Sequence, residues 1–404
     1  MRNNILLSAL TVTSQENLEP EAAETAELNP VTDQTVVEID EILEEVRDGA
    51  DSVEEHDDAV EELEGAAESL ESLIASLESA IADGGMNPQA ADIHSRAMIN
   101  AVRRLPVDGA QYTVSVESFG GTGDKLQASM EAMEGAKDLL AKIWNAIKSA
   151  VQSAWAAVIK FVQTIGQSGE VLIRAGTQLK GSASKLSGNP KTETMAIGNA
   201  GKFLHTGGKM EGLVSQKLHV ILAGGEAVSK SAAAASAGLK SMTGKMMTGT
   251  MDDESFEAFA KSVMDPLPKD TLPGGREFEA AGDLSKLVEK TKFEDATQEV
   301  ATPQKAELIA IANEIVAVGR MVSAYDKKYF KELQKSVNDF ISKQEDLLKK
   351  ANYEKDETAG IKGVMAGFKR SAAIARAAGP SYMSYAANAA KASFGFAKKA
   401  LAAY

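Results

Sequence analysis

The chain has 404 residues, of which four are His and none is Cys. The lack of cysteine excludes disulfide scaffolds, thiolate zinc sites, iron–sulfur clusters and cysteine nucleophiles. The 43 Lys and Arg against 58 Asp and Glu give a net charge of −15, and this charge is unevenly divided. Residues 1–117 carry five basic and 27 acidic side chains, a net −22, whereas residues 118–404 carry 38 and 31, a net +7. The sequence thus joins an acidic arm to a mildly basic body. Such a charge division indicates that the two parts favour different binding partners.

The composition favours helices over sheets. Phe, Trp and Tyr make up only 5% of the chain, whereas Ala, Ser and Lys are abundant. This is typical of long, Ala-packed helices rather than of a β-sandwich or barrel. We therefore predict an all-α, elongated fold of long helices, with no set of strands able to form a sheet.

No stretch of the sequence is predicted to cross a membrane. The longest apolar region, residues 151–165, is interrupted by polar side chains, and a span needs about 20 apolar residues. The apolar run over residues 5–10 is shorter than the core of an export signal. We therefore expect no integral membrane span and no conventional export signal.

The acidic arm is predicted to contain one long helix. Residues 1–38 are expected to be disordered, because they include a polar, acidic stretch with two prolines. Over residues 39–83 apolar side chains recur every seven positions, as in a coiled-coil-like helix. These positions are Ile39, Val46, Val53, Val60, Ala67, Ile74 and Ile81. A shorter helix is expected over residues 89–104.

The flanks of the heptad helix are almost wholly acidic or small, and Arg47 is its only Lys or Arg. A parallel homodimer would set acid against acid, so a basic partner helix is favoured, either in the same chain or in another. The alternative is a solvated acidic helix packed on its own body.

The first half of the body is predicted to begin with its strongest amphipathic helix. Apolar residues follow helical spacing from Leu126 to Ile165, and a second helix is expected over residues 170–186. Residues 192–250 are rich in glycine and are interrupted by pairs such as Gly224-Gly225. Shorter helices are therefore expected there.

The second half of the body is predicted to follow a loop. Prolines and glycines mark this loop near residues 266–275. Residues 303–350 are predicted to form a second long helix, whose apolar stripe slips after Tyr329. Two more helices, both basic, are expected over residues 360–378 and 382–404.

The segment between arm and body is predicted to be extended and then flexible. Within residues 109–117, Tyr112, Val114 and Val116 alternate with polar residues, and a glycine-rich stretch follows. Small-residue loops are preferred sites of cleavage. Ser115-Val116-Glu117-Ser118 is therefore a physically good site for a protease, although an ordinary interdomain linker fits the same facts.

No pattern points to catalysis, a cofactor or a metal site. No two His are spaced i, i+3 or i, i+4. The run Gly120–Lys125 lacks the spacing of a phosphate-binding loop, and the acidic clusters lack the residue order of a calcium loop. We therefore expect a protein that is not an enzyme, with no cofactor and no metal site.

Basic residues near the C-terminus are candidates for contact with nucleic-acid phosphates. They are Lys362, Lys369, Arg370, Arg376, Lys391, Lys398 and Lys399. Because the body's charge is modest and no recognition motif is present, only nonspecific, salt-sensitive contact is expected. Solvated helix faces account for most of these side chains equally well.

The junction and the helix after it resemble the internal head (inner body) proteins of phiKZ-like giant tailed phages. Ser115-Val116-Glu117, followed by Ser118-Phe119-Gly120, looks like the boundary where a prohead protease cuts in that family, after Glu in a small-residue-x-Glu motif. The segment from Ala128 to Ile147 looks like the start of a mature body. The stretch that carries the resemblance covers about residues 110–165.

The resemblance implies that residues 1–117 are an acidic propeptide and residues 118–404 a mature helical body. It implies a non-enzymatic virion protein, made in the host cytoplasm and packaged inside the phage head. The implied partners are the prohead protease, other capsid and inner-head proteins and, nonspecifically, packaged DNA. Further copies of the motif occur; those in the arm could be extra cuts, and those in the body should be hidden in helices.

Two other functions also fit the sequence. The amphipathic helix over residues 126–165, with its two Trp, and the basic C-terminus would suit a membrane-active or ejected effector. The heptad pattern would suit an unprocessed coiled-coil scaffold or adaptor.

Overall fold

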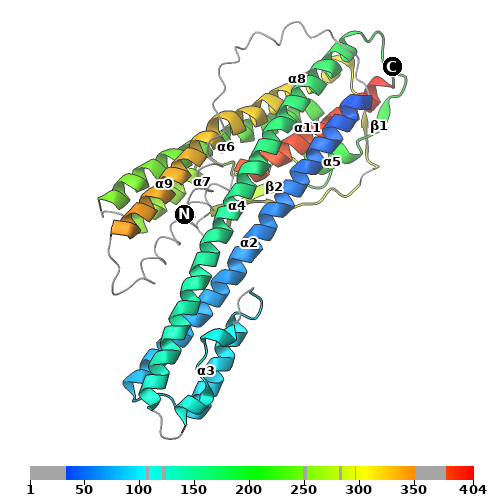
Figure 1. The fold of residues 1–404 in the computed structure, drawn as a ribbon. Coiled ribbons are helices and arrows are strands. Elements are labelled where there is room, and N and C mark those ends of the chain that lie inside the picture. The colour runs from blue at the N-terminus through cyan, green and yellow to red at the C-terminus, as the bar shows by residue number, and fades with distance from the viewer. Residues whose placement is uncertain are drawn as a thin grey trace.

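A computed structural model describes residues 33–105, 109–120, 124–248, 253–281, 284–295, 297–350 and 379–404. Over these residues the fold is all-α, as predicted, with a few short strands. Two long helices, α2 and α4, run side by side, and one end of this pair projects from a bundle of further helices as a stalk (Figure 1). We call this projecting end the stalk; its buried apolar residues lie between Val60 and Val151. The remainder is the bundle, whose buried apolar residues are Ile39, Leu43, Val46 and others from Trp155 onward.

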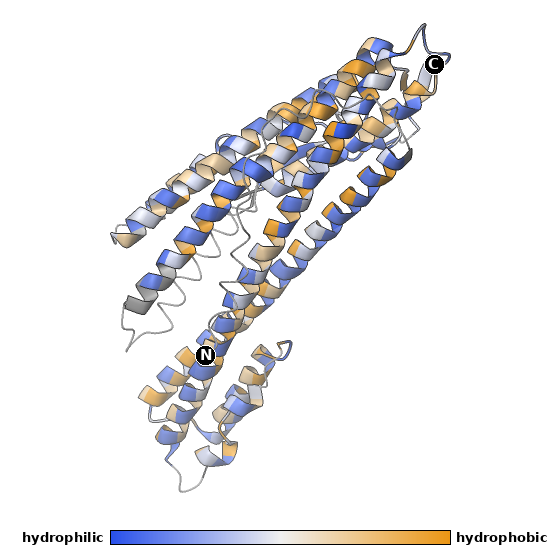
Figure 2. Cartoon of the chain, turned by 45° about the horizontal axis from the view of Figure 1, so that its top comes forward, coloured by the Kyte–Doolittle hydropathy of each residue, from blue (hydrophilic) through white to orange (hydrophobic). Residues whose placement is uncertain are grey.

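Helix α2 spans Asp33–Ala82 and begins six residues before the predicted heptad helix. Its buried positions include the heptad residues Ile39, Val46, Val60, Ala67, Ile74 and two companion leucines, Leu70 and Leu77. Figure 2 shows hydrophobic residues interspersed among hydrophilic ones along both long helices. The helix ends at Gly84 and Gly85, whose φ values of 91° and 98° lie in the left-handed region that favours glycine.

Helix α4 spans Lys125–Ser184, 60 residues or about 90 Å of helix. It starts at Asp124, whose side chain accepts a hydrogen bond from the Leu126 N–H at 2.9 Å. The expectation of two helices, ending at residue 165 and restarting at residue 170, is wrong. The small residues between them continue the helix and let α8 (Lys305–Ala324) approach closely: a Cβ on Gly169 would lie 2.6 Å from the carbonyl oxygen of Gly319.

Between the long helices the chain forms α3 (Pro88–Ala101) and two short 3₁₀ turns, η1 (Gly109–Tyr112) and η2 (Val116–Phe119). The expectation of an extended segment over residues 109–117 is therefore wrong for most of its length. No partner strand lies beside it among the described residues, so its backbone groups pair locally instead. The Ser118 N–H, for example, donates to the carbonyl of Ser115 at 2.9 Å.

After α4 the chain forms α5 (Asn199–Leu204), α6 (Val214–Met247) and α7 (Asp253–Met264). The long helix α6 corrects the expectation that Gly224-Gly225 breaks the chain into shorter helices. These glycines remain helical because other helices pack directly on them. A side chain at either position would collide with Tyr382 or Met321, and the Tyr382 hydroxyl donates to the Ile221 carbonyl at 2.6 Å.

The predicted long helix over residues 303–350 consists of α8, a π-helical turn η3 (Tyr325–Phe330) and α9 (Lys331–Lys350). A π turn holds more residues than an α turn, so it shifts the apolar stripe around the helix. This explains the slip seen in the sequence after Tyr329. The turn packs against α4, where the rings of Phe330 and Trp155 lie 5.8 Å apart.

Two small antiparallel sheets correct the expectation that no strands would pair. Strand β1 (Thr194–Ala196) pairs with β4 (Glu299–Ala301). Strands β2 (Arg276–Ala281) and β3 (Leu284–Glu289) form a hairpin directly after the proline-rich loop. Each sheet has only two strands, so the all-α class stands.

The chain ends in α11 (Gly379–Leu401), which lies in the bundle (Figure 1). The helix expected over residues 360–378 lies outside the described residues. The buried apolar residues form two clusters, one in the bundle and one in the stalk. Helices α2 and α4 contribute to both clusters, so the arm and the body share their hydrophobic cores.

Candidate functional site

The predicted cleavage site lies on η2, at the point where the arm meets α4. Ser115, Glu117 and Ser118 are exposed and Val116 is half-buried. Next to them, Phe119 is only 1% exposed and belongs to the stalk core. The bond between Glu117 and Ser118 is therefore on the surface, while the adjacent ring anchors the turn that carries it.

The elements on both sides hold this turn in place. Gly135 of α4 has no room for a side chain, because the Tyr112 carbonyl lies against it. The Tyr112 hydroxyl accepts a hydrogen bond from Lys142, whose Nζ lies 4.8 Å from the centre of the Tyr112 ring. On the other side, Gly120 lies close to Pro88 at the start of α3. The junction is thus clamped between α3 and α4.

Several other copies of the three-residue motif lie inside long helices. In α2 they include Ala66-Ala67-Glu68, Ser69-Leu70-Glu71 and Ser76-Leu77-Glu78, and in α4 and α6 they include Ser129-Met130-Glu131 and Gly224-Gly225-Glu226. A protease that needs an extended substrate must unfold a helix to reach any of these. The copy at residues 115–117 sits instead in a turn of four residues.

Charged residues of the arm face basic residues of the body. In the bundle, Asp40 pairs with Lys391 of α11 at 2.8 Å, and Glu38 pairs with Arg174 of α4 at 3.4 Å. In the stalk, Glu78 lies 3.6 Å from Lys137 of α4. The acidic helix is thus packed on its own body, where these three carboxylates lie beside basic side chains.

Three of the seven candidate DNA-contacting residues are described, and all three lie on α11. Lys391 is paired with Asp40, Lys398 is half-buried and Lys399 is exposed. Together with Lys202 they line a cavity of about 730 Å³ between α11, α5 and the first turns of α2. Lys362, Lys369, Arg370 and Arg376 lie outside the described residues.

The apolar side chains that suggested a membrane-active protein are largely buried inside the fold. Trp144 and Trp155 of α4 are only 9% and 6% exposed, because α2 and the bundle cover them. One described helical stretch, Lys305–Lys343, is long and apolar enough to cross a membrane, but half of its most apolar window is buried inside the protein. A core helix has this same property.

Two buried ionisable side chains among the described residues, His205 and Tyr325, are packed inside the fold. His205 is fully buried, stacks on Phe293 and accepts a hydrogen bond from the Gly208 N–H at 3.1 Å. Burial raises the pKa of the Tyr325 hydroxyl well above its usual range, which keeps it neutral. Within the described residues no cluster of three or more His, Asp or Glu side chains could hold a metal ion.

The fold and its surface thus define a class: an elongated helical protein whose acidic arm is packed along its own body. The family model of the phiKZ-like phage internal head proteins matches residues 34–399, and the chain belongs to this family. It is therefore a structural protein of the phage head interior, where it associates with other capsid components. No curated protein and no solved structure gives a significant match.

Proposed function

We propose that this internal head protein is made as a precursor and is cut between Glu117 and Ser118 by the head-maturation protease of the phage. The cut divides an acidic propeptide, residues 1–117, from a helical body, residues 118–404. The observation that carries the proposal is the exposure of this bond at the boundary where the charge changes from −22 to +7. The protein acts in this role as a substrate and a structural component and has no catalytic part.

The setting of the junction supports this choice of bond. Ser115 and Glu117 are exposed at η2 and Val116 is half-buried, whereas the helical copies would each require a long helix to open. Short surface turns open at lower free energy than helices in a packed core, so they are cut first.

The test is the N-terminus of the protein in purified phage particles, read by mass spectrometry. We expect it to be Ser118, and an intact N-terminus at Met1 would overturn the proposal. In phage carrying Glu117→Gln the cut should be lost. In the matched variant Glu131→Gln, which alters the motif copy inside α4, the cut should persist.

We further propose that the body contacts packaged DNA nonspecifically. The body alone carries +7, and Lys391 and Lys399 both lie on α11, Lys399 in its last turn. In the precursor the arm opposes this contact, because Asp40 occupies Lys391 and the arm's charge repels phosphates. Binding should accordingly fall steeply with salt.

A further inference from the structure

Helix α2 covers a long apolar face of α4 and is not merely tethered to it. In the stalk, Leu70 and Leu77 are fully buried in the cluster that contains Leu139, Ile143 and Ile147 of α4. The stalk cluster also holds α3 and η2 residues such as Met98 and Phe119. All of these arm elements therefore pack on α4 through the same core.

The bundle end of α2 is held by a second set of contacts. Ile39, Leu43 and Val46 are buried in the bundle cluster together with Val158 and Val162 of α4. Further along, Gly49 lies close enough to Phe161 that an added Cβ would be 3.0 Å from its ring. The two helices are thus in contact from the bundle to the stalk.

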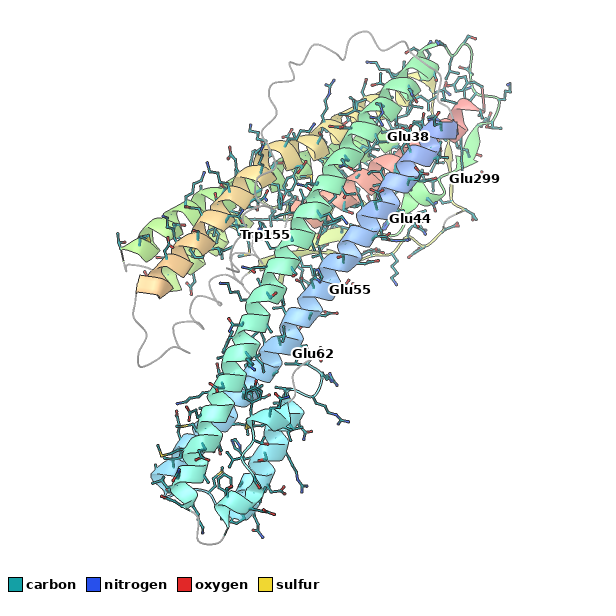
Figure 3. The ribbon with its side chains drawn as sticks, viewed as in Figure 1. Glu38, Glu44, Glu55, Glu62, Trp155 and Glu299 are labelled. Carbon is teal, nitrogen blue, oxygen red and sulfur yellow. The ribbon has the colours of Figure 1, made fainter. Side chains whose placement is uncertain are left out.

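Polar contacts reinforce both ends of this interface. The buried Thr35 hydroxyl donates to the Gln178 side chain at 2.8 Å, close to the pairs of Glu38 and Asp40 with basic residues of the body. At the opposite end the Met86 N–H donates to the Ser129 hydroxyl at 2.9 Å. The glutamates Glu44, Glu55 and Glu62 are exposed and spaced along α2 (Figure 3). The acidic side chains thus lie outside an apolar contact.

We infer that cleavage after Glu117 does not release the arm, and that residues 33–117 stay bound to residues 118–404 as a separate chain. This inference rests on the proposed function for its biological setting. The cut breaks one bond in an exposed turn and removes none of the contacts between α2 and α4. The surface that binds the freed arm is the apolar face of α4 together with its flanking basic residues.

Two consequences follow from this arrangement. The described contacts keep the arm's negative charge beside the body after the cut, so the change to +7 occurs when the arm leaves. An arm that leaves the body also loses the packing that stabilises α2, so its helix would open and expose its motif copies, such as Ser76-Leu77-Glu78, to the protease. A first cut at the junction followed by cuts within α2 is therefore the sequence of events that the interface favours.

The test makes the cut with a different enzyme, so it does not depend on the phage protease. A recognition sequence for a sequence-specific protease is inserted between Glu117 and Ser118 of the full chain, and the purified protein is cut and run on a size-exclusion column without denaturant. We expect both fragments in equimolar amounts in one peak at the elution volume of the uncut protein. Separation of the arm from a body that keeps its helical circular dichroism would overturn the inference.

Variants of the interface sharpen this experiment. Leu70→Ala with Leu77→Ala removes buried side chains from α2, and after cutting the arm should be lost from the shared peak. The matched variant Glu55→Ala with Glu62→Ala changes only exposed positions and should leave the arm bound. Circular dichroism before cutting shows whether each variant is folded; if the leucine variant is not, Leu77→Ala alone replaces it.

The result of this test is independent of the result of the N-terminus test of the proposed function. Virion protein with an intact Met1 would overturn cleavage after Glu117 but would not affect binding of the arm in the engineered protein. Conversely, an arm that dissociates at once would overturn the inference and leave the cleavage site unaffected. Retention of the arm by the leucine variant would show that the α2 stripe is not the binding element, and would also overturn it.

Discussion

Phe119 anchors the turn that carries the junction. Its ring is 1% exposed in the stalk core, two positions after Glu117 in a turn of only four residues. A protease must draw this turn into an extended form, and the turn cannot extend while the ring stays buried. Burial of Phe119 therefore adds to the free energy of local opening at the junction.

We predict that Phe119→Ala accelerates cleavage after Glu117. Truncating a buried Phe costs a core about 3–5 kcal/mol, and much of this loss would lower the free energy of opening. The rate of cleavage of the purified full chain by the maturation protease should rise at least tenfold, on the order of 1.4 kcal/mol or more. An unchanged rate, followed on gels over time, would mean that opening of the turn does not limit the cut.

His205 makes the bundle sensitive to acid. Burial lowers its pKa below the ordinary value of 6.5; nearby Glu289 opposes this shift and Arg276 adds to it. Its Nε2 is buried with no hydrogen-bond partner among the described residues, so protonation would place an unpaired charge in the core. Because the unfolded chain takes up the proton more readily, this contribution to stability is present above pH 6.5 and is lost as the pH falls through the folded pKa.

We therefore predict that His205→Gln reduces the pH dependence of stability. The glutamine keeps an acceptor for Gly208 but does not titrate. The melting temperature of the full chain should fall between about pH 7.5 and pH 5.5, and it should fall less in the variant. Equal falls in both proteins would show that His205 is not a source of the acid sensitivity; His94, whose pKa is also lowered by burial, would then be examined in the same way.

At the scale of elements, the packing of α4 on α8 depends on two glycines. A Cβ on Gly169 would lie 2.6 Å from the Gly319 carbonyl oxygen, and a Cβ on Gly319 would lie 2.7 Å from the Gly169 carbonyl oxygen. The backbones thus approach more closely than any other residue type allows. This contact explains why α4 continues through its small residues rather than ending there.

We predict that Gly169→Ala destabilises the protein although alanine favours helix. The clash with a backbone atom should cost about 1–3 kcal/mol, more than the gain in helix propensity of up to about 1 kcal/mol. The control is Gly65→Ala in α2, where an added Cβ meets nothing within 4 Å; it should stabilise by up to about 1 kcal/mol. Urea unfolding measures both, and changes of the same sign would contradict the prediction.

The sequence predicted the elements with local signals and missed those that depend on neighbours. The heptad residues predicted the buried face of α2, and the slip after Tyr329 marked the π turn. The hairpin of β2 and β3 was missed although Gly282-Asp283, a dipeptide type common in two-residue hairpin loops, stands between its strands. Six-residue strands in a helical chain carry too little periodicity to compete with the helix pattern.

At the scale of the whole molecule, the arm and the body form one structure with shared cores. The sequence alone left open whether the acidic arm packs on its own body or on another chain. The helices α2 and α4 pack together along the stalk and into the bundle (Figure 1). The junction is therefore an exposed turn within a single folded unit.

We predict that removing the arm exposes a DNA-binding activity. The body, residues 118–404, should bind double-stranded DNA more tightly than the full chain in a filter-retention assay, and both affinities should fall as salt rises. Replacing Lys391, Lys398 and Lys399 with Ala in the body should make the logarithmic salt dependence shallower by up to about 3. Equal binding by body and full chain, with both folded by circular dichroism, would contradict masking by the arm.

The sequence by itself determined the helical class, the charge division at residue 117 and the heptad face of the arm. Each follows from composition or from periodicity along a single segment, which short-range physics fixes. Only the tertiary structure decided that the partner of the acidic helix is α4 of the same chain, that α4 is continuous, and that the Glu117–Ser118 bond lies in a turn anchored by Phe119. These features depend on contacts between residues far apart in the sequence, such as Gly169 with Gly319, which no local pattern encodes.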